Sequence, residues 1–188
     1  MDYSINEKFC DANNAKDIID FCIKRGEVFN YRPGEHWDCR HIHDEGFKEK
    51  IITSLINNYK TKRFKLWFDF DSFSLKNSLI SLTSYYDGRF LNLHKDADSE
   101  LTTVIVLSDN FKGGQFALTT DKNPPIRFET LNGVSTFDLK LGDFISFNGS
   151  TTYHGVLPVT EGTRYALNIW MDNTNSNRPS RKANKTLI

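Results

Sequence analysis

The spacing of apolar residues predicts two helices near the start of the chain. From Asp11 to Arg25 the apolar side chains recur at close to 3.6 residues, and Gly26 follows as a stop signal. A second stripe with the same period runs from Phe47 to Tyr59. The segment between the two stripes, residues 26–46, has no such period and is predicted to be a loop.

Beyond residue 63 the apolar pattern changes to a period of two or to short apolar runs, which predict β-strands. The predicted strands cover residues 64–70, 78–86, 101–107, 115–119, 126–129, 136–139, 144–147 and 164–171. Turn signals such as Gly113-Gly114 and Glu161-Gly162 separate them. Many short strands with regular turns favour a jelly roll over βαβ units. The expected class is therefore α+β, mainly β, with a jelly-roll core and both N-terminal helices packed on one sheet.

Length and composition favour a single folded domain. The chain has 188 residues, of which 13% are aromatic, including 15 Phe, so it can bury a sizeable core. We expect one domain over residues 1–172, divided into a helical N-terminal part (1–62) and the jelly-roll core (63–172). Residues 173–188 are polar and basic and are predicted to be a tail. Lys and Arg number 24, as do Asp and Glu, so no global field selects a polyanionic or membrane partner.

Cysteine usage and the N-terminal sequence predict a cytoplasmic protein. The three cysteines, Cys10, Cys22 and Cys39, are odd in number and form no CxxC pair, which favours a reducing compartment. The first residues do not combine a basic region with an apolar run, as a signal peptide would. No apolar stretch approaches the length of a membrane span.

The segment His94-Lys95-Asp96 is the first candidate for metal chemistry. On an extended chain, residues i and i+2 point to the same side, so an imidazole and a carboxylate can reach one ion. Alone, His-x-Asp is a common tripeptide, and a surface strand end is the simpler interpretation. His154 starts a further predicted strand and supplies a second imidazole. Two histidines and one carboxylate leave positions open on an ion, which suits non-haem Fe(II).

Arg164 adds an anion-binding group to this set. We expect a turn at Glu161-Gly162 to join two antiparallel strands and to place His154 and Arg164 on neighbouring strands. A guanidinium binds a carboxylate bidentately and stays charged when desolvated. The alternative is a surface ion-pair residue, but the apolar residues that follow Arg164 indicate a buried strand.

Four motifs together resemble one enzyme family. They are Tyr-x-x-Gly-x-Phe-Leu-x-x-His-x-Asp at 85–96, Gly-Gly-x-Phe at 113–116, Gly-Asp-x-x-x-Phe at 142–147, and His-x-Val-x-Pro-Val-x-x-Gly-x-Arg-Tyr-x-x-x-x-Trp at 154–170. This pattern is similar to that of the 2-oxoglutarate/Fe(II)-dependent dioxygenase superfamily, and most similar to its prolyl-4-hydroxylase-like branch. The resemblance covers about half of the chain.

The resemblance implies a fold, cofactors and roles for individual residues. The fold would be a double-stranded β-helix with the metal in its mouth. His94, Asp96 and His154 match the catalytic iron ligands, Arg164 matches the residue that pairs with the distal carboxylate of 2-oxoglutarate, and Tyr85 matches an aromatic residue of the cosubstrate pocket. The implied cofactors are Fe(II), 2-oxoglutarate as cosubstrate and O2, with ascorbate as a reductant. The implied reaction is hydroxylation of a substrate with release of succinate and CO2.

The chain departs from the family pattern at three positions. Val106 stands where many relatives have a tyrosine that bonds the oxoacid, and Leu91 stands where many prolyl hydroxylases have another tyrosine. Glu100 replaces an arginine that often precedes the Thr-rich strand. These changes leave the ligand set intact and affect the expected contacts of the oxoacid.

Several alternatives stay open at this point. The family favours a peptidyl proline or another protein side chain as substrate, while a nucleobase, a free amino acid or a small metabolite is also compatible with the sequence. A catalytically silent metal-binding jelly roll is the alternative to an enzyme. The loop that contains His36, Cys39, His41 and His43 could hold a second metal, or it could cover the site and contact substrate through Trp37 and Arg40. The tail carries Arg178, Arg181, Lys182 and Lys185, which could contact nucleic acid or simply be solvated.

Overall fold

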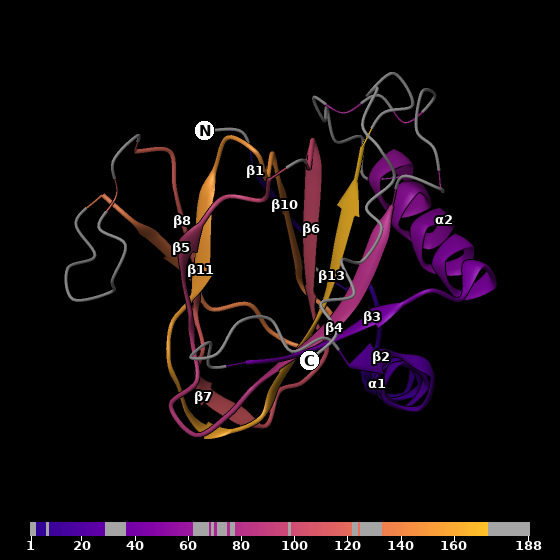
Figure 1. Ribbon diagram of the computed structural model, residues 1–188, viewed down its shortest axis with the longest axis horizontal. Helices are drawn as coiled ribbons and strands as arrows, with labels where there is room; N and C mark the ends of the chain where they lie inside the picture. Colours follow the sequence, from indigo (N-terminus) through magenta and orange to yellow (C-terminus); the bar gives the residue numbers. More distant parts are fainter. Residues whose placement is uncertain are drawn as a thin grey trace, which may run out of the picture.

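The computed structural model is built mainly of β-strands, with two helices near the N-terminus (Figure 1). It describes residues 3–6, 8–28, 37–61, 68, 70, 75, 78–97, 99–121, 124 and 133–172. The helices are α1 (Ala12–Arg25) and α2 (Glu45–Thr61), so both predicted helices are confirmed.

In the described part of the chain the strands form three antiparallel sheets. The largest has seven strands in the order β1 (Tyr3–Asn6), β10 (Phe144–Phe147), β6 (Leu101–Val106), β13 (Arg164–Met171), β4 (Leu79–Tyr85), β3 (Asp38–Ile42) and β2 (Glu27–Val28). The second has four strands in the order β5 (Leu91–His94), β11 (Tyr153–Val156), β8 (Phe116–Thr119) and β9 (Ser135–Phe137). A two-stranded ribbon pairs β12 (Val159–Gly162) with β7 (Phe111–Gly113).

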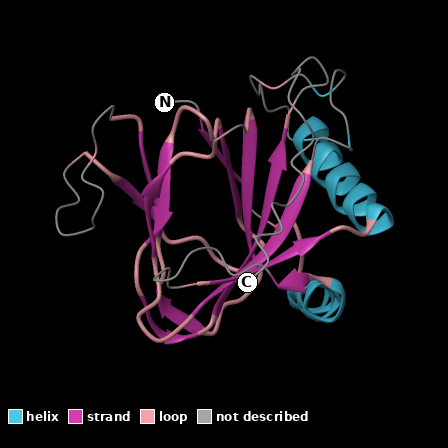
Figure 2. Cartoon of the chain, viewed as in Figure 1, coloured by secondary structure: helices cyan, strands magenta, loops and turns pink. Residues whose placement is uncertain are grey.

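The two larger sheets face one another, and both helices cover the outer face of the seven-stranded sheet (Figures 1 and 2). This arrangement confirms the predicted jelly roll with helices on one sheet. Side chains alternate between the faces of each strand, so the seven-stranded sheet contributes to two cores. One core lies against the helices and includes Ile105, Leu167 and Ile169. The other lies between the sheets and includes Val104, Val106 and Ala166.

Local signals explain why both helices begin and end where they do. The carboxylate of Asp11 accepts a hydrogen bond from the backbone N–H of Asn14 at 2.8 Å, which caps α1. The carboxylate of Asp44 accepts one from the N–H of Phe47 at 2.8 Å at the start of α2. At the end of α1, Gly26 lies so close to the backbone that a Cβ would come within 2.5 Å of the carbonyl oxygen of Cys22. The chain can therefore leave the helix here only with a glycine.

The N-terminal part of the chain is more than a pair of helices. The segment predicted as a loop, residues 26–46, contains β2 and β3, and β1 pairs with β10 at the opposite edge of the sheet. β3 carries Asp38, Arg40 and His41, so its sequence lacks a simple alternation of apolar and polar residues. Pairing with β4 supplies the backbone hydrogen bonds that this polar segment could not find alone. The predicted strand at 126–129, most of the one at 64–70 and the tail at 173–188 lie outside the described residues.

A buried hydroxyl cluster joins α2 to the seven-stranded sheet. The Tyr59 hydroxyl lies 3.0 Å from Thr103 Oγ1 and also bonds Ser146 Oγ, and the two hydroxyls on the sheet lie 2.9 Å apart. All three residues are buried. Each hydroxyl can both donate and accept, so the three groups satisfy one another in a place that water does not reach.

Replacing Tyr59 by Phe should therefore destabilise the fold by about 1–2 kcal/mol, because the two remaining hydroxyls lose a buried partner. Urea denaturation of the two proteins measures this difference. Tyr165→Phe is the matched control, because Tyr165 is half-buried on the same face of the sheet and is not part of the cluster. Equal stability of the Tyr59→Phe protein and the wild type would show that the cluster contributes nothing to folding.

Candidate metal centre

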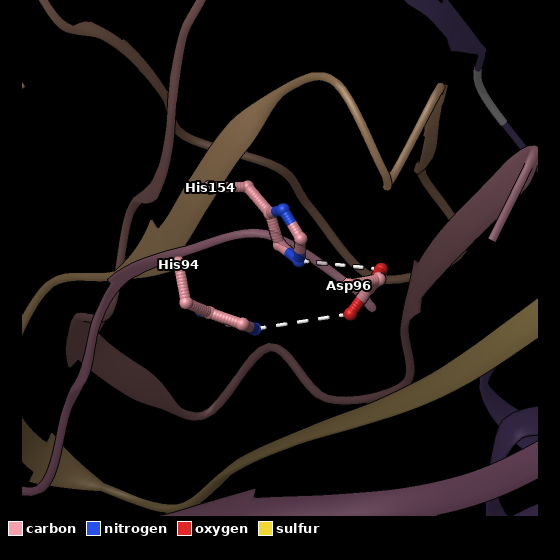
Figure 3. A group of neighbouring side chains, drawn as sticks. All are labelled: His94, Asp96 and His154. Atoms are coloured by element: carbon pink, nitrogen blue, oxygen red, sulfur yellow. Dashed lines mark ion pairs between the residues drawn. The ribbon is translucent and has the colours of Figure 1, made fainter. Parts of the chain in front are cut away.

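Two side chains on neighbouring strands of the four-stranded sheet and a third just beyond a strand end converge on one point (Figure 3). His94 ends β5, Asp96 follows two residues later, and His154 lies on β11. β11 and β5 are paired with His154 directly opposite His94, and the centroids of the two imidazole rings lie 4.3 Å apart. One ligand atom from each of the three residues lies within 4.8 Å of the others. The structure thus brings together the three residues predicted to bind metal.

Backbone carbonyl groups orient both imidazoles toward the common point. His94 Nδ1 lies 3.0 Å from the carbonyl oxygen of Asn92, and His154 Nδ1 lies 3.1 Å from that of Thr152. A carbonyl oxygen only accepts, so each Nδ1 carries the hydrogen and each Nε2 presents a lone pair. The Nε2 atoms lie 3.9 Å (His94) and 3.6 Å (His154) from carboxylate oxygens of Asp96. These separations exceed hydrogen-bond length and leave room for an ion between the three groups.

Burial keeps His154 in the form that a metal needs. The residue is 5% exposed, and desolvation together with the nearby His94 lowers the pKa of His154 to about 4. The imidazole is therefore neutral at neutral pH, as a metal ligand must be.

Asp96 is held from two sides. Its backbone N–H donates to the carbonyl oxygen of Gly149 at 3.0 Å, and Thr102 Oγ1 donates to its Oδ2 at 2.6 Å. A Cβ on Gly149 would lie 2.5 Å from Asp96 Oδ2 and would also collide with Thr102 Oγ1. The turn after β10 therefore needs a glycine because the carboxylate and its hydrogen-bond donor fill the space beside it.

A pocket extends from the metal centre to Arg164. Its walls come from both large sheets and are formed by Trp37, Thr83, Tyr85, Leu91, His94, Thr102, Val104, Phe116, His154, Gly155, Val156, Arg164, Asn168 and Trp170. Arg164 is 1% exposed, and neither of its terminal nitrogens, Nη1 and Nη2, has a hydrogen-bond partner among the residues that the structure describes. Its Cζ lies 5.7 Å from the centre of the Tyr85 ring. The pocket therefore holds a buried cation for which the described residues supply no carboxylate.

Burial of this cation is unfavourable for the chain on its own. Desolvation lowers the pKa of Arg164 to about 10, which corresponds to a loss of stability on the order of 3 kcal/mol. The guanidinium stays charged at neutral pH, so this cost is present there in full and is relieved only as the pH rises above about 10. An anionic ligand with a carboxylate would offset the cost and satisfy both nitrogens. The donor set thus fits a 2-oxodicarboxylic acid that also reaches the metal.

The expected placement of His154 and Arg164 on neighbouring strands of one hairpin is wrong. β11 belongs to the four-stranded sheet and β13 to the seven-stranded sheet, and β12 lies between them in the chain. β12 pairs with β7 instead, and Gly162 has a φ of +71° where the chain crosses between the sheets. The two residues reach the same pocket from opposite sheets.

The other residues singled out in the sequence have different positions. Trp37 lines the pocket, and its ring stacks on Tyr85 with a centroid separation of 6.4 Å and an interplanar angle of 26°. Arg40 does not line the pocket: it pairs with Leu82, which belongs to the core under the helices. Among the departures from the family pattern, Leu91 lines the pocket and Val106 is buried between the sheets.

A second metal site is absent from the described residues. The group formed by His94, Asp96 and His154 is the one set of potential ligands that converges there. His43 Nε2 instead lies 3.3 Å from Glu27 Oε2 in an exposed pair, and His36 lies outside the described residues. None of the helices in the described part of the chain is long and apolar enough to span a membrane.

The sequence did not indicate that Thr102, Gly149 and Asn168 belong to the site. Thr102 and Asn168 lie within predicted strands, where polar residues on one face are common. Gly149 lies just after the predicted strand at 144–147, where a glycine is expected for the turn alone. The spatial contacts that give these residues a role join segments far apart in sequence.

Several solved structures share this fold. The prolyl-4-hydroxylase of Pseudomonas putida superimposes with a TM-score of 0.64, at 14% identity over 92% of each chain. A prolyl hydroxylase from Trichoplax adhaerens, in complex with a hypoxia inducible factor peptide, gives a TM-score of 0.66 at 15% identity, over 92% of this chain and 84% of that one. HygX from Streptomyces hygroscopicus, with nickel, 2-oxoglutarate and hygromycin B bound, gives 0.60 at 13% identity, over 93% and 84%. No curated protein sequence matches the chain.

A jelly roll with a His/Asp/His ligand set and a buried guanidinium in one pocket is the arrangement of a metal-dependent, oxoacid-using oxygenase. Residues 80–172 match the family described as the 2OG-Fe(II) oxygenase superfamily, and the chain belongs to that superfamily. The predicted superfamily and the predicted use of Fe(II), 2-oxoglutarate and O2 are therefore confirmed.

Replacing Gly149 by Ala should weaken metal binding roughly 10- to 100-fold, because the added methyl group displaces Asp96 or its donor Thr102. Isothermal titration calorimetry with Co(II) measures the change in metal affinity. Gly46→Ala is the matched control, since a Cβ there meets only Asp44 Oδ1 at 3.6 Å, an ordinary contact. Unchanged affinity in the Gly149→Ala protein would contradict the assigned role of this glycine.

Proposed function

We propose that this 2-oxoglutarate/Fe(II) oxygenase hydroxylates a peptidyl proline or another protein side chain. The observation that carries its oxygenase chemistry is the convergence of His94, Asp96 and His154 in a pocket that also holds the guanidinium of Arg164, which no described residue pairs. A structural metal site needs no buried cation beside it, whereas a site for an oxoacid needs both groups.

Each residue has a defined task in the proposed reaction. His94, Asp96 and His154 would hold ferrous iron, and Arg164 would bind the distal carboxylate of 2-oxoglutarate. Tyr85 packs beside the guanidinium and, with the aromatic wall of the pocket, would keep water from the bound cosubstrate. When bound, iron and 2-oxoglutarate supply the activation of O2 for C–H hydroxylation, with release of succinate and CO2.

The choice of substrate class rests on likeness of fold. The chain resembles prolyl hydroxylases, one of them in complex with a peptide, over more than nine-tenths of its length. Trp37 lies at the pocket wall and would contact the substrate. The second candidate is a small metabolite, and the likeness to HygX with hygromycin B bound favours it. Both candidates use the same metal centre.

An assay for succinate decides first between an enzyme and a silent metal-binding jelly roll. The protein is incubated with Fe(II), 2-oxoglutarate, ascorbate and O2, together with peptide or metabolite pools, and products that gain one oxygen atom are identified by mass spectrometry. Asp96→Ala should abolish succinate release, because it removes the only anionic ligand of the described set. Absence of succinate with every pool, despite bound iron, would favour the silent module.

Replacing Arg164 by Met should raise the 2-oxoglutarate concentration needed for half-maximal turnover by roughly 100-fold, because a charge-assisted pair with the distal carboxylate is lost. Metal affinity should stay unchanged, and stability without ligand should equal or exceed that of the wild type, because a buried charge is removed. Steady-state kinetics, metal titration and urea denaturation test the three statements.

Arg25→Met serves as the control, since Arg25 lies in the last turn of α1 on the outer face of the sheet. Equal losses of metal and 2-oxoglutarate affinity in the Arg164 variant would indicate a folding role and would contradict the assignment.

A further inference from the structure

Trp37 and Tyr85 form an aromatic wall beside Arg164. The two rings stack with a centroid separation of 6.4 Å, and Cζ of Arg164 lies 5.7 Å from the centre of the Tyr85 ring. The Trp37 Nε1 atom is buried and has no hydrogen-bond partner among the described residues. The register of β3 on β4 begins one residue after Trp37, with Asp38 opposite Ser84. The backbone at Asp38 therefore sets where the Trp37 ring can lie.

The Asp38 side chain bonds the turn that leads from β4 to β5. Its Oδ1 accepts a hydrogen bond from Arg89 Nη1 at 3.0 Å, and its Oδ2 accepts one from the Tyr86 hydroxyl at 2.9 Å. The Arg89 guanidinium also lies over the Tyr86 ring, 3.9 Å from its centre. Each of the three groups thus contacts the other two, and we call this set of Asp38, Tyr86 and Arg89 the Asp38 latch.

The turn that carries Arg89 is itself fixed to the strand that follows the metal-binding strand β11. The Gly88 N–H donates to the carbonyl oxygen of Val159 at 2.8 Å, and the Val159 N–H donates to that of Arg89 at 3.0 Å. Val159 begins β12, the next strand after β11. Arg89 is therefore a fixed anchor, and the Asp38 latch ties β3 to it.

The Asp38 latch and the aromatic wall lie back to back on the same two segments. Trp37 and Tyr85 line the pocket. Asp38 and Tyr86 follow them directly in the sequence and point to the other side, because successive side chains of an extended chain alternate. The latch thus fixes the two backbones at the level at which the Trp37 and Tyr85 rings meet.

We propose that Asp38 is a positioning residue that, through Arg89 and Tyr86, holds Trp37 against the pocket wall and closes the end of the pocket that takes the distal carboxylate of 2-oxoglutarate. The inference rests on the proposed function and concerns how this chain retains its cosubstrate. Asp38 acts through Trp37 and does not line the pocket itself. The side chains of Asp38 and Arg89 are 50% and 29% exposed, so each bond of the latch is weak and the effect comes from the set.

The test is the binding of 2-oxoglutarate to the Mn(II)-loaded protein, measured by isothermal titration calorimetry. Asp38→Ala should weaken binding roughly 5-fold. Trp37→Ala, which removes the stacked ring, should weaken it roughly 10-fold. The direction of the Asp38 effect is decisive, because Asp38 and 2-oxoglutarate are both anionic. Removal of a nearby negative charge would by itself strengthen binding, whereas loss of the latch weakens it.

Two further measurements separate positioning from a general structural effect. In the Trp37→Ala protein, the additional change Asp38→Ala should cause no further loss of 2-oxoglutarate affinity, because Asp38 acts through that ring. In protein labelled with 5-fluorotryptophan, the ¹⁹F NMR signal of Trp37, assigned through Trp37→Phe, should shift in the Asp38→Ala variant, and the signal of Trp170 should stay in place.

Tyr86→Phe removes one bond of the latch without changing any charge and should weaken 2-oxoglutarate binding roughly 2- to 3-fold. This variant provides the test if Asp38→Ala does not fold. Glu161→Ala is the matched control, because it removes an exposed carboxylate that lies 2.8 Å from Lys112 Nζ on the β7–β12 ribbon. The control should bind 2-oxoglutarate no more weakly than the wild type.

Equal or tighter binding of 2-oxoglutarate by the Asp38→Ala or Tyr86→Phe protein would overturn the inference and leave the proposed function intact. Additive losses in the double variant, or an unmoved Trp37 signal, would overturn it as well, because Asp38 would then act independently of Trp37. A wild-type protein that binds Mn(II) but no 2-oxoglutarate would contradict both the inference and the proposed function.

Discussion

The desolvated guanidinium of Arg164 is the constraint on which the organisation of the pocket depends. A buried cation with no counter-charge among the described residues lowers the stability of the chain, and the remainder of the fold must offset that loss. Arg164 begins β13, which pairs along its length with both β4 and β6. The central position of this strand holds the side chain in the pocket through backbone pairing rather than through contacts of its charge.

One face of the seven-stranded sheet packs against the helices and stabilises the fold, and the other face lines the pocket. On β13, Leu167 and Ile169 face the helices and belong to the core there, whereas Arg164 and Asn168 face the pocket. β6 follows the same rule, with Ile105 under the helices and Thr102 in the pocket. A shift of one residue in the pairing of either strand would exchange the two faces. The helices thus do more than cover apolar surface, because their core enforces the register that directs polar residues inward.

The sequence was sufficient for the metal ligands and for the residues that define the family pattern. His94 and Asp96 are two residues apart, so local backbone geometry alone brings them together. The anion-binding role of Arg164 could be proposed from the sequence because a cation within an apolar strand is buried and requires an anionic partner. The expected hairpin failed because periodicity identifies strands without stating their partners, and β12 pairs with β7. β3 was missed for a related reason, since its polar residues become a strand only through pairing with β4.

The metal and cosubstrate chemistry of the pocket is easier to predict from its residues than the identity of the substrate. Metal and cosubstrate are bound by side chains whose charge or lone pairs admit few other uses.

The remaining wall of the pocket is less specific. Asn168 Nδ2 donates to Thr83 Oγ1 at 3.0 Å, and Thr83 Oγ1 in turn donates to the carbonyl oxygen of Ala166 at 3.3 Å. This chain of bonds fixes the orientation of the amide, with its nitrogen toward Thr83 and its oxygen left as an acceptor. Trp37, on the same wall, has an indole N–H that no described residue accepts. A neutral acceptor and a neutral donor can recognise an amide, a hydroxyl or a ring nitrogen, so selectivity here depends on the shape of the aromatic wall as much as on its hydrogen bonds.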